Sequence, residues 1–313
     1  MTDRTDGRAA APPLRVGLMR QPDEPAGCRA RDLAALASAG LDHVVTADHV
    51  SFRVGAGRDG LIDAASLLAT GDLPVYVGLY LLALRHPVLV ARQLSTLAEG
   101  APDRLVLGVG VGGEDRHEVE VCGVDPRTRG LRMDECLSVL RALLAGGPVT
   151  HQGRFFDLDQ ALVLPAPSAP VPLVVGGRSD AALVRAARLG DGWLGIWVSA
   201  RRYAEVVSRI ADLADEAGRP DVAWRHGLNV WCGLGADRAD GRKHLAAGMS
   251  AMYGLPFEAF ERWSPSGSAE EVADFLAPYV DAGARDLNLI CPGPDRAAIL
   301  TRVAEVRRLL LDR

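Results

Sequence analysis

An acid and an imidazole stand side by side at the end of an apolar run. The stretch "LDHVVTADHV" covers residues 41–50, and its central valines predict a buried strand that finishes on Asp48 and His49. A histidine in this position can give or take a proton near neutral pH, and the acid beside it can orient a ring or bind a polar ligand. The pair could equally cap the following loop, so it does not decide between chemistry and structure by itself.

Glycines crowd the end of a second apolar run, "LGVGVGGEDRHE" at residues 107–118. Because they lack side chains, glycines such as Gly110, Gly112 and Gly113 let a flat ligand approach the backbone closely. Glu114 follows at once and adds an acid at the same place. The spacing differs from the dinucleotide-binding fingerprint, so this run does not predict a Rossmann fold.

A third run, "VVGGRSDAAL" at residues 174–183, predicts a strand, a turn and the start of a helix. Free backbone N–H groups at a helix N-terminus attract anions. Gly176 and Gly177 allow close approach to the backbone, Arg178 adds a positive charge and Ser179 adds a hydroxyl. We interpret the run as a phosphate cradle, with an ordinary capped turn as the alternative.

Eight short apolar runs alternate with helical patterns from residue 14 onward. They cover residues 14–19, 43–48, 74–84, 104–111, 171–177, 192–198, 227–234 and 286–291. Several are apolar on both faces, which is typical of parallel strands covered by helices. Eight such units predict a single (β/α)8 TIM barrel with its active face at the carboxyl ends of the strands. The pattern alone leaves a doubly wound open sheet as the alternative.

Helix boundaries are legible in three places. Pro87 suits the first position of a helix. Ser179 suits the N-cap of a second helix that stops at Gly190. Ser268 begins a third, and Glu271 follows at the spacing of a capping box.

Residues 146–170 interrupt the alternation, because they are too long and too rich in Gly and Pro for a plain connection. We expect an insertion over one mouth of the barrel, with a simple surface excursion as the alternative. The polar residues 1–13 predict a disordered tail and no signal peptide. Residues 14–313 are expected to form one domain.

Composition excludes several classes of function. The formal net charge is −5 with both signs mixed, so nucleic acid is not an expected partner. The five cysteines form no CxxC pair and predict neither a disulfide framework nor a metal site. Because no apolar stretch reaches the length of a membrane span, we expect a soluble, cytoplasmic protein. The GxSxG, HExxH and GKS/GKT signatures are absent, which disfavours hydrolases and nucleotidases.

Most of the chain resembles the bacterial luciferase-like flavin and deazaflavin oxidoreductases (LLM class). The resemblance is carried by residues 77–112, 129–158, 171–193 and 267–290, in family order. It implies a TIM barrel with an insertion after the fourth strand unit. It also implies a cofactor, FMN or the deazaflavin coenzyme F-420 (8-hydroxy-5-deazaflavin), at the carboxyl mouth. A non-prolyl cis peptide would back the cofactor ring at Gly78–Leu79, and the phosphate would lie at residues 176–179.

The resemblance also implies roles for the residues that opened this section. The branch that uses the deazaflavin often carries an Asp-His pair where the second strand ends, as in "ADHV" here. Asp48 would then bond the cofactor ring or its ribityl chain. His49 would face the substrate and handle the proton together with Glu114. The run "GVGVGGE" has one more residue before the acid than those relatives show.

Three functional hypotheses follow. The leading one is an oxidoreductase that transfers a hydride between coenzyme F-420 and a small organic substrate. The second is a two-component FMN monooxygenase that uses oxygen and reduced FMN from a separate reductase. The third is a barrel that binds a flavin-like ligand without catalysis. The family resemblance further implies a homodimer.

Overall fold

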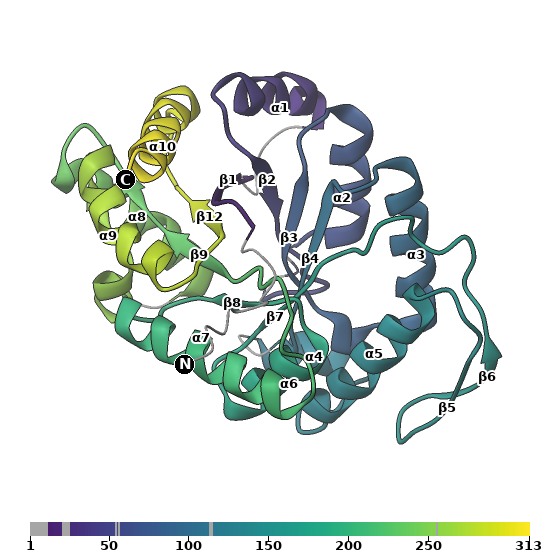
Figure 1. The fold of residues 1–313 in the computed structure, drawn as a ribbon. Coiled ribbons are helices and arrows are strands. Elements are labelled where there is room, and N and C mark those ends of the chain that lie inside the picture. The colour runs from purple at the N-terminus through teal and green to yellow at the C-terminus, as the bar shows by residue number, and fades with distance from the viewer. Residues whose placement is uncertain (1–11, 21–25, 54, 56, 113–114, 255) are drawn as a thin grey trace, which may run out of the picture.

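A computed structural model describes residues 12–20, 26–53, 55, 57–112, 115–254 and 256–313. Eight parallel strands close into a barrel inside a ring of helices (Figure 1). In barrel order the strands are β1 (Arg15–Met19), β12 (Asp286–Ile290), β9 (Gly227–Trp231), β8 (Gly192–Gly195), β7 (Leu173–Gly176), β4 (Leu105–Val109), β3 (Val75–Tyr80) and β2 (His43–Thr46). The predicted (β/α)8 barrel is confirmed, and the doubly wound alternative was wrong.

Three of the predicted strands extend too far, and one of them is the run 192–198, which leaves the sheet after Gly195. The run 74–84 leaves the sheet after Tyr80, and Leu82–Leu84 form a 3-10 helix. The run 227–234 breaks after Trp231, and β10 (Gly233–Leu234) pairs with β11 (Ser266–Gly267) outside the barrel. The reason is that an unbroken apolar run does not distinguish a buried strand from a buried turn.

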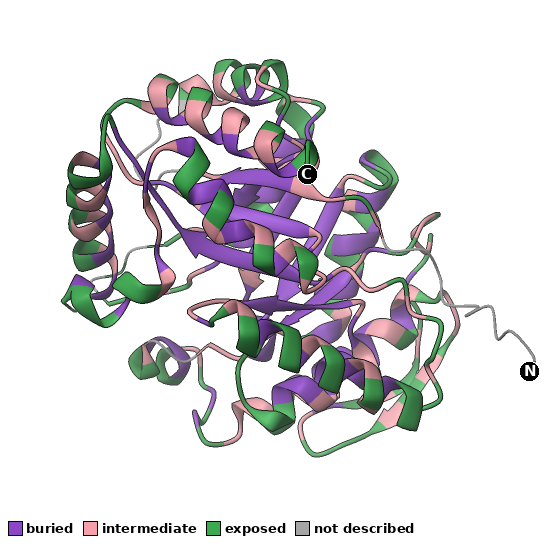
Figure 2. Cartoon of the chain, turned by 60° about the vertical axis from the view of Figure 1, so that its left-hand side comes forward, coloured by how far each residue is buried: buried purple, intermediate pink, exposed green. Residues whose placement is uncertain are grey.

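Helices cover the barrel on all sides. They are α1 (Arg29–Ser38), α2 (Gly60–Thr70), α3 (Pro87–Gly100), α4 (Arg116–Val121), α5 (Arg129–Leu144), α6 (Asp180–Leu189), α7 (Ala200–Glu216), α8 (Arg238–Tyr253), α9 (Ala269–Asp281) and α10 (Arg296–Leu311). Their buried residues face the strands and their exposed residues face outward (Figure 2). The barrel itself is filled with side chains, including Val45, Tyr76, Val106, Val174 and Leu194. The interior is thus a packed core, and only the rim can receive a ligand.

The predicted helix starts are confirmed. Pro87 is the first residue of α3. The Ser179 hydroxyl accepts the backbone N–H of Ala182 and caps α6. Ser268 and Glu271 form the expected capping box of α9. Local sequence therefore determines where these helices begin, which in turn sets the geometry of the loops at the rim.

The insertion is an antiparallel hairpin, β5 (Val149–Gln152) and β6 (Asp157–Ala161). It lies outside the helical ring beside α3 and α5, and not over the mouth as expected (Figure 1). The physical reason is a set of contacts with these helices. Glu135 on α5 accepts the N–H groups of Phe155 and Phe156 and lies 3.0 Å from Nε2 of His151.

The described residues do not include 1–11, so the expected tail falls almost wholly outside the part of the chain that the structure describes. Among the described helices, none is both long enough and apolar enough to span a membrane.

Candidate active site

Four neighbouring strands carry the predicted site residues at their carboxyl ends. β2, β3, β4 and β7 are consecutive in the barrel. The described candidates are Asp48 and His49 after β2, Gly78 and Leu79 in β3, Gly110 and Gly112 after β4, and Gly176, Gly177, Arg178 and Ser179 at and after β7. The fold therefore brings the three sequence motifs to one side of one rim.

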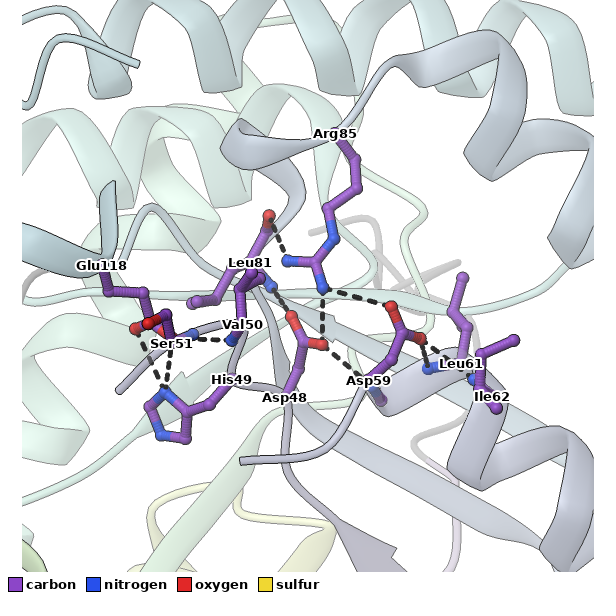
Figure 3. A network of polar contacts seen from close by, with 11 residues as sticks. Asp48, His49, Val50, Ser51, Asp59, Leu61, Ile62, Leu81, Arg85 and Glu118 are labelled. Carbon is purple, nitrogen blue, oxygen red and sulfur yellow. Dashed lines mark hydrogen bonds and ion pairs between the residues drawn. The ribbon is translucent and has the colours of Figure 1, made fainter. Parts of the chain in front are cut away.

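The Asp48 carboxylate lies inside the protein and joins two loops. Its Oδ1 accepts the backbone N–H of Gly60 at 2.8 Å, and its Oδ2 accepts that of Leu81 at 2.8 Å. Nη2 of Arg85 lies 2.8 Å from Oδ1, and the Asp48 side chain is 0% exposed (Figure 3). Burial raises the pKa of Asp48, against the lowering effect of Arg85 and the two backbone N–H groups.

This placement corrects one prediction. We expected Asp48 to bond the cofactor ring or its ribityl chain, but three donors occupy its oxygens and its side chain does not reach the surface. The cause is local, because the loops after β2 and β3 carry buried N–H groups that need acceptors. Asp48 is therefore a residue that holds the rim together.

His49 turns the other way, toward α4. Its Nδ1 lies 3.2 Å from Oε2 and 3.3 Å from Oε1 of Glu118 (Figure 3). Its ring packs on Phe52 with 4.2 Å between centroids, and 17% of its side chain is exposed. Glu118 is almost fully buried and also accepts the N–H groups of Val50 at 2.7 Å and Ser51 at 3.1 Å. One carboxylate thus positions both the imidazole and the loop that follows it.

Glu118 determines which nitrogen of His49 carries the proton. A carboxylate only accepts hydrogen bonds, so the neutral ring must carry its proton on Nδ1, and Nε2 is left as an acceptor. Nε2 has no hydrogen-bond partner among the described residues. Protonation at Nε2 would create an imidazolium that the adjacent carboxylate stabilises. The pair can therefore take a proton at Nε2 and return it.

Glu118 is the acid that the structure shows beside His49. Glu114 and Gly113 lie outside the described residues, so their predicted roles stay predictions. Glu118 was missed as a partner. The signal that could have found it is Asp115, which caps α4 and stands three residues before Glu118. This is the spacing of a helix start with an acid in the first turn, and it would have placed Glu118 at the start of a helix beside the rim.

The irregularity expected in the third strand is present. The Gly78–Leu79 peptide bond is cis, and the pairing of β3 with β4 shifts its register between Val77 and Tyr80. Gly78 is buried, whereas Leu79 is partly exposed at the rim. Leu79 is therefore the residue of this pair that a ligand could touch.

Inside the barrel, a chain of polar side chains supports this bulge. Asn229 Nδ2 donates to the Gly78 carbonyl at 3.2 Å, and Asn288 Nδ2 donates to Asn229 Oδ1 at 2.8 Å. Asn288 Oδ1 lies 2.7 Å from Nε2 of His43. Burial lowers the pKa of His43 to about 4, so the ring is neutral and donates from Nε2. β3, β9, β12 and β2 are thereby linked through the barrel interior.

Two rim glycines have a role different from the one predicted. We expected Gly110 to let a flat ligand approach the backbone and Gly176 to form part of the phosphate cradle. A Cβ atom at Gly176 would lie 2.4 Å from Leu79 Cδ1, and one at Gly110 would lie 3.0 Å from the same atom. These positions lack side chains because Leu79 fills the space between β4 and β7. Gly112 differs, since its φ of +70° serves the turn after β4.

The predicted phosphate cradle has the geometry of an anion site. Gly177 has a φ of +123°, and its carbonyl accepts the indole N–H of Trp193 at 2.7 Å. In a trans peptide the next N–H points the opposite way, so that of Arg178 is directed away from the core. The N–H groups of Arg178 and Ser179 have no partner among the described residues, and neither has the Arg178 guanidinium.

These donors suit the phosphate end of a flavin or deazaflavin. Free N–H groups at the start of the ten-residue helix α6, next to an unpaired guanidinium, are the chemistry that holds a phosphate. Asp180 in the first turn of α6 carries a negative charge, which opposes the binding of an anion there. In the part of the chain that the structure describes, no group of three His, Cys, Asp or Glu side chains is arranged to hold a metal ion.

Comparison with known proteins decides the family. Residues 13–265 match the family described as luciferase-like monooxygenase, which is well over half of the chain. The chain belongs to the luciferase-like monooxygenase family. The resemblance noted in the sequence is therefore confirmed.

Individual relatives add detail. An uncharacterized protein of Mycobacterium tuberculosis is 38% identical over 138 residues, which cover 44% of this chain and 47% of that protein. The chain thus matches about half the length of this relative. An F420-dependent glucose-6-phosphate dehydrogenase of Nakamurella multipartita is 27% identical over 328 residues, covering 94% of this chain and 95% of that enzyme.

Among solved structures, an F420-dependent secondary alcohol dehydrogenase in complex with an F420-acetone adduct has a TM-score of 0.80 at 20% identity. The match covers 95% of this chain and 99% of the other. At this identity the likeness supports the luciferase-like fold of the family and does not extend to the substrate.

Proposed function

We propose that this luciferase-like protein is an oxidoreductase that transfers a hydride between coenzyme F-420 and a small organic substrate at the carboxyl-end rim. The observation that carries the proposal is the His49–Glu118 pair, which follows β2, the strand that pairs with β3, and whose Nε2 has no hydrogen-bond partner among the described residues. Relatives named F420-dependent glucose-6-phosphate dehydrogenase, which match nearly the whole chain, support the choice of cofactor.

Each group at the rim has a defined task in this reaction. When bound, the deazaflavin accepts or gives a hydride at its ring carbon C5. When the substrate carbon that gives up the hydride carries a hydroxyl group, its oxidation also releases the hydroxyl proton, and His49 Nε2 takes that proton. Glu118 stabilises the resulting imidazolium. In the reverse direction the same nitrogen returns the proton.

Binding is the task of the α6 cradle. The N–H groups of Arg178 and Ser179 and the Arg178 guanidinium would hold the cofactor phosphate. Leu79 would contact the ring, because it is the partly exposed residue of the bulge. Asp48 keeps the loops after β2 and β3 in place through its three hydrogen bonds.

The FMN-dependent monooxygenase is the second candidate, and the description of the family favours it. The α6 cradle would accept the FMN phosphate as well as that of the deazaflavin, because FMN also ends in a phosphate. The enzyme would then use oxygen and would need a separate reductase to supply reduced FMN. His49 would serve the oxygen chemistry in place of hydride transfer.

A binding titration separates the candidates. Apo-protein is titrated with coenzyme F-420 and, separately, with FMN, and ligand fluorescence and thermal stability are followed together, since a ligand that binds only the folded state raises apparent stability. We expect micromolar or tighter binding of coenzyme F-420. Preference for FMN, together with oxygen consumption when reduced FMN is supplied, would establish the monooxygenase instead. Tight binding of either cofactor, without any reaction that depends on His49, would support the third hypothesis, a barrel that binds the cofactor without catalysis.

A homodimer in the cytoplasm is the arrangement we propose for the molecule, on the strength of the family resemblance. Light scattering of the purified protein measures the oligomeric state directly. A mass of one chain at micromolar concentration would contradict the dimer.

A further inference from the structure

A groove beside the phosphate cradle is lined by positive charge and indole rings. It has a volume of about 400 Å³ and lies outside the carboxyl ends of β7 and β8. Its lining side chains are Arg178, Arg202 and Arg262 together with Trp193, Trp197, Trp263, Val198, Ser199 and Val206. Arg178 belongs both to the cradle and to this three-arginine groove, so one ligand could reach from one into the other.

The charges in the three-arginine groove are largely uncompensated. No carboxylate is among the lining residues. Arg178 has no ion-pair partner among the described residues, and Arg262 has only the face of Trp263 at 3.8 Å from its ring centroid. Arg202 contacts Glu205 at 3.2 Å, a pair that is about half exposed on both sides. In a protein of net charge −5, such a local excess of cations indicates an anionic ligand.

Two backbone turns present N–H groups beside the three-arginine groove, and both are held by a hydrogen bond to the carbonyl that precedes the N–H group. Trp193 Nε1 donates to the Gly177 carbonyl at 2.7 Å, and the Tyr279 hydroxyl donates to the Val198 carbonyl at 2.7 Å. Both carbonyls are therefore turned toward the core, and the N–H group of the next residue points the other way. Those next residues, Arg178 and Ser199, have no backbone N–H partner among the described residues.

Two helices begin at these turns. Ser179 caps α6 and Ser199 caps α7, and in each case the hydroxyl accepts an N–H from the first turn. Each hydroxyl keeps its own proton as a donor. The helix dipoles add partial positive charge at the N-termini of α6 and α7. Trp197, which lines the groove, also holds a buried indole N–H without a partner among the described residues.

We infer that the three-arginine groove binds the anionic part of the cofactor that lies beyond its phosphate. The inference depends on the proposed function. Coenzyme F-420 carries carboxylates on the far side of its phosphate, whereas FMN ends there. The α6 cradle serves the phosphate, and Arg202 and Arg262 receive the carboxylates that follow. The groove thereby distinguishes the deazaflavin from FMN at a distance from the reacting ring.

The test compares the affinity of three ligands for matched variants. The Arg202→Gln, Arg262→Gln double variant is compared with the wild type and with Arg201→Gln. Arg201 is the neighbour of Arg202 on α7, also pairs with Glu205, and does not line the groove. The ligands are coenzyme F-420, the same deazaflavin cut back to its ribityl chain, and FMN. Affinity is read by fluorescence titration at two salt concentrations, so the result does not depend on turnover.

We expect the double variant to bind coenzyme F-420 about tenfold more weakly at low salt, as the loss of two partly exposed ion pairs would give. Its affinity should also depend less on salt, because fewer charges are screened. The cut-back deazaflavin and FMN should bind the wild type and the double variant equally. Arg201→Gln should behave as the wild type. An unchanged affinity for coenzyme F-420 in the double variant would overturn the inference.

A separate probe distinguishes this failure from failure of the proposed function. If the wild type does not bind coenzyme F-420, thermal stabilisation by inorganic tripolyphosphate is measured in the same variants. Stabilisation that is lost only in the double variant would keep the groove as an anion site and assign its ligand to an anionic substrate, which overturns the assignment to the cofactor. Equal stabilisation in all variants would overturn the groove as an anion site altogether.

Discussion

Nδ1 of His49 lies 3.2 Å from Oε2 of Glu118, and the same carboxylate accepts two N–H groups from the loop that carries the imidazole. The acid therefore sets both the position and the tautomer of the ring. Because the carboxylate is almost fully buried, its charge acts on the imidazole with little screening by solvent.

Replacement of Glu118 by Gln tests this relationship. We expect kcat to fall about 100-fold, because the variant loses the charge that stabilises the imidazolium and can present an N–H to Nδ1. Affinity for the cofactor should change by less than about threefold. In spectra of ¹⁵N-histidine-labelled protein, His49 should show the proton on Nδ1 in the wild type but not in the variant. Glu120→Gln, on the exposed side of α4, is the matched control and should change neither.

Removal of the imidazole gives a larger effect of the same kind. His49→Ala should lower kcat by about 10²- to 10⁴-fold, the usual contribution of a general acid or base. Cofactor affinity should stay close to that of the wild type, since the cradle is at α6. Added imidazole should restore part of the rate. Full activity of the variant would assign the proton transfer to another group.

Asp48 is expected to affect stability before chemistry. Asp48→Asn keeps the shape but breaks the buried pair with Arg85 and places an amide where a carboxylate accepted three bonds. The free energy of unfolding should fall by about 3 kcal/mol, measured by urea denaturation. Asp274→Asn removes an exposed pair with Arg313 and should cost less than about 1 kcal/mol. A stable Asp48→Asn protein that no longer binds the cofactor would restore Asp48 as a ligand residue.

Acid should destabilise the barrel through His43. Burial lowers the pKa of His43 from 6.5 to about 4, so between these values the unfolded chain binds a proton that the folded chain does not. The stabilisation is present above pH 6.5 and is lost as the pH falls toward 4, by up to about 3 kcal/mol. Burial lowers the pKa of His226 to about 3, which adds to the same trend.

Urea titrations between pH 7 and 4 measure this loss. His43→Gln should give a shallower dependence of unfolding free energy on pH. His244→Gln, which changes a partly exposed histidine, should keep the slope of the wild type. Equal slopes in all three proteins would contradict the assignment to His43.

The rim glycines can be tested by crowding Leu79. Gly176→Ala places a Cβ atom 2.4 Å from Leu79 Cδ1 and should cost about 1–3 kcal/mol of stability through overpacking. Leu79→Ala in the same chain should restore most of the loss, so the two changes should be strongly non-additive. Gly100→Ala, where a Cβ atom meets nothing within 4 Å, should be neutral. Additive losses would mean that Gly176 is needed for another reason.

The barrel could be predicted from the sequence because strand runs and helix caps are local signals. Ser179 and Ser268 lie at helix starts that a few residues define. The insertion was found from its composition, but its place was not. It depends on Glu135, which pairs with residues up to 21 positions away, and local pattern carries no information about such a contact.

The site was only partly predictable for the same reason. His49 reaches the rim because the strand before it is apolar and ends there. Whether Asp48 turns outward or inward depends on N–H groups of Gly60 and Leu81, 12 and 33 residues away. Spacing on one strand cannot reveal these partners. A family resemblance supplied the bulge at Gly78, which periodicity did not indicate.

The chain of Asn229, Asn288 and His43 beneath Gly78 has a consequence for how such an enzyme can change. The bulge is anchored from within the barrel, by three buried side chains that lie on strands β9, β12 and β2. Changes in the loops after β4 and β8 therefore leave these interior hydrogen bonds to the Gly78 carbonyl in place. The hydrogen-bonded support of the bulge and the loops of the rim are separate parts of the molecule. A family of such proteins can therefore vary its rim loops while it keeps the same interior support.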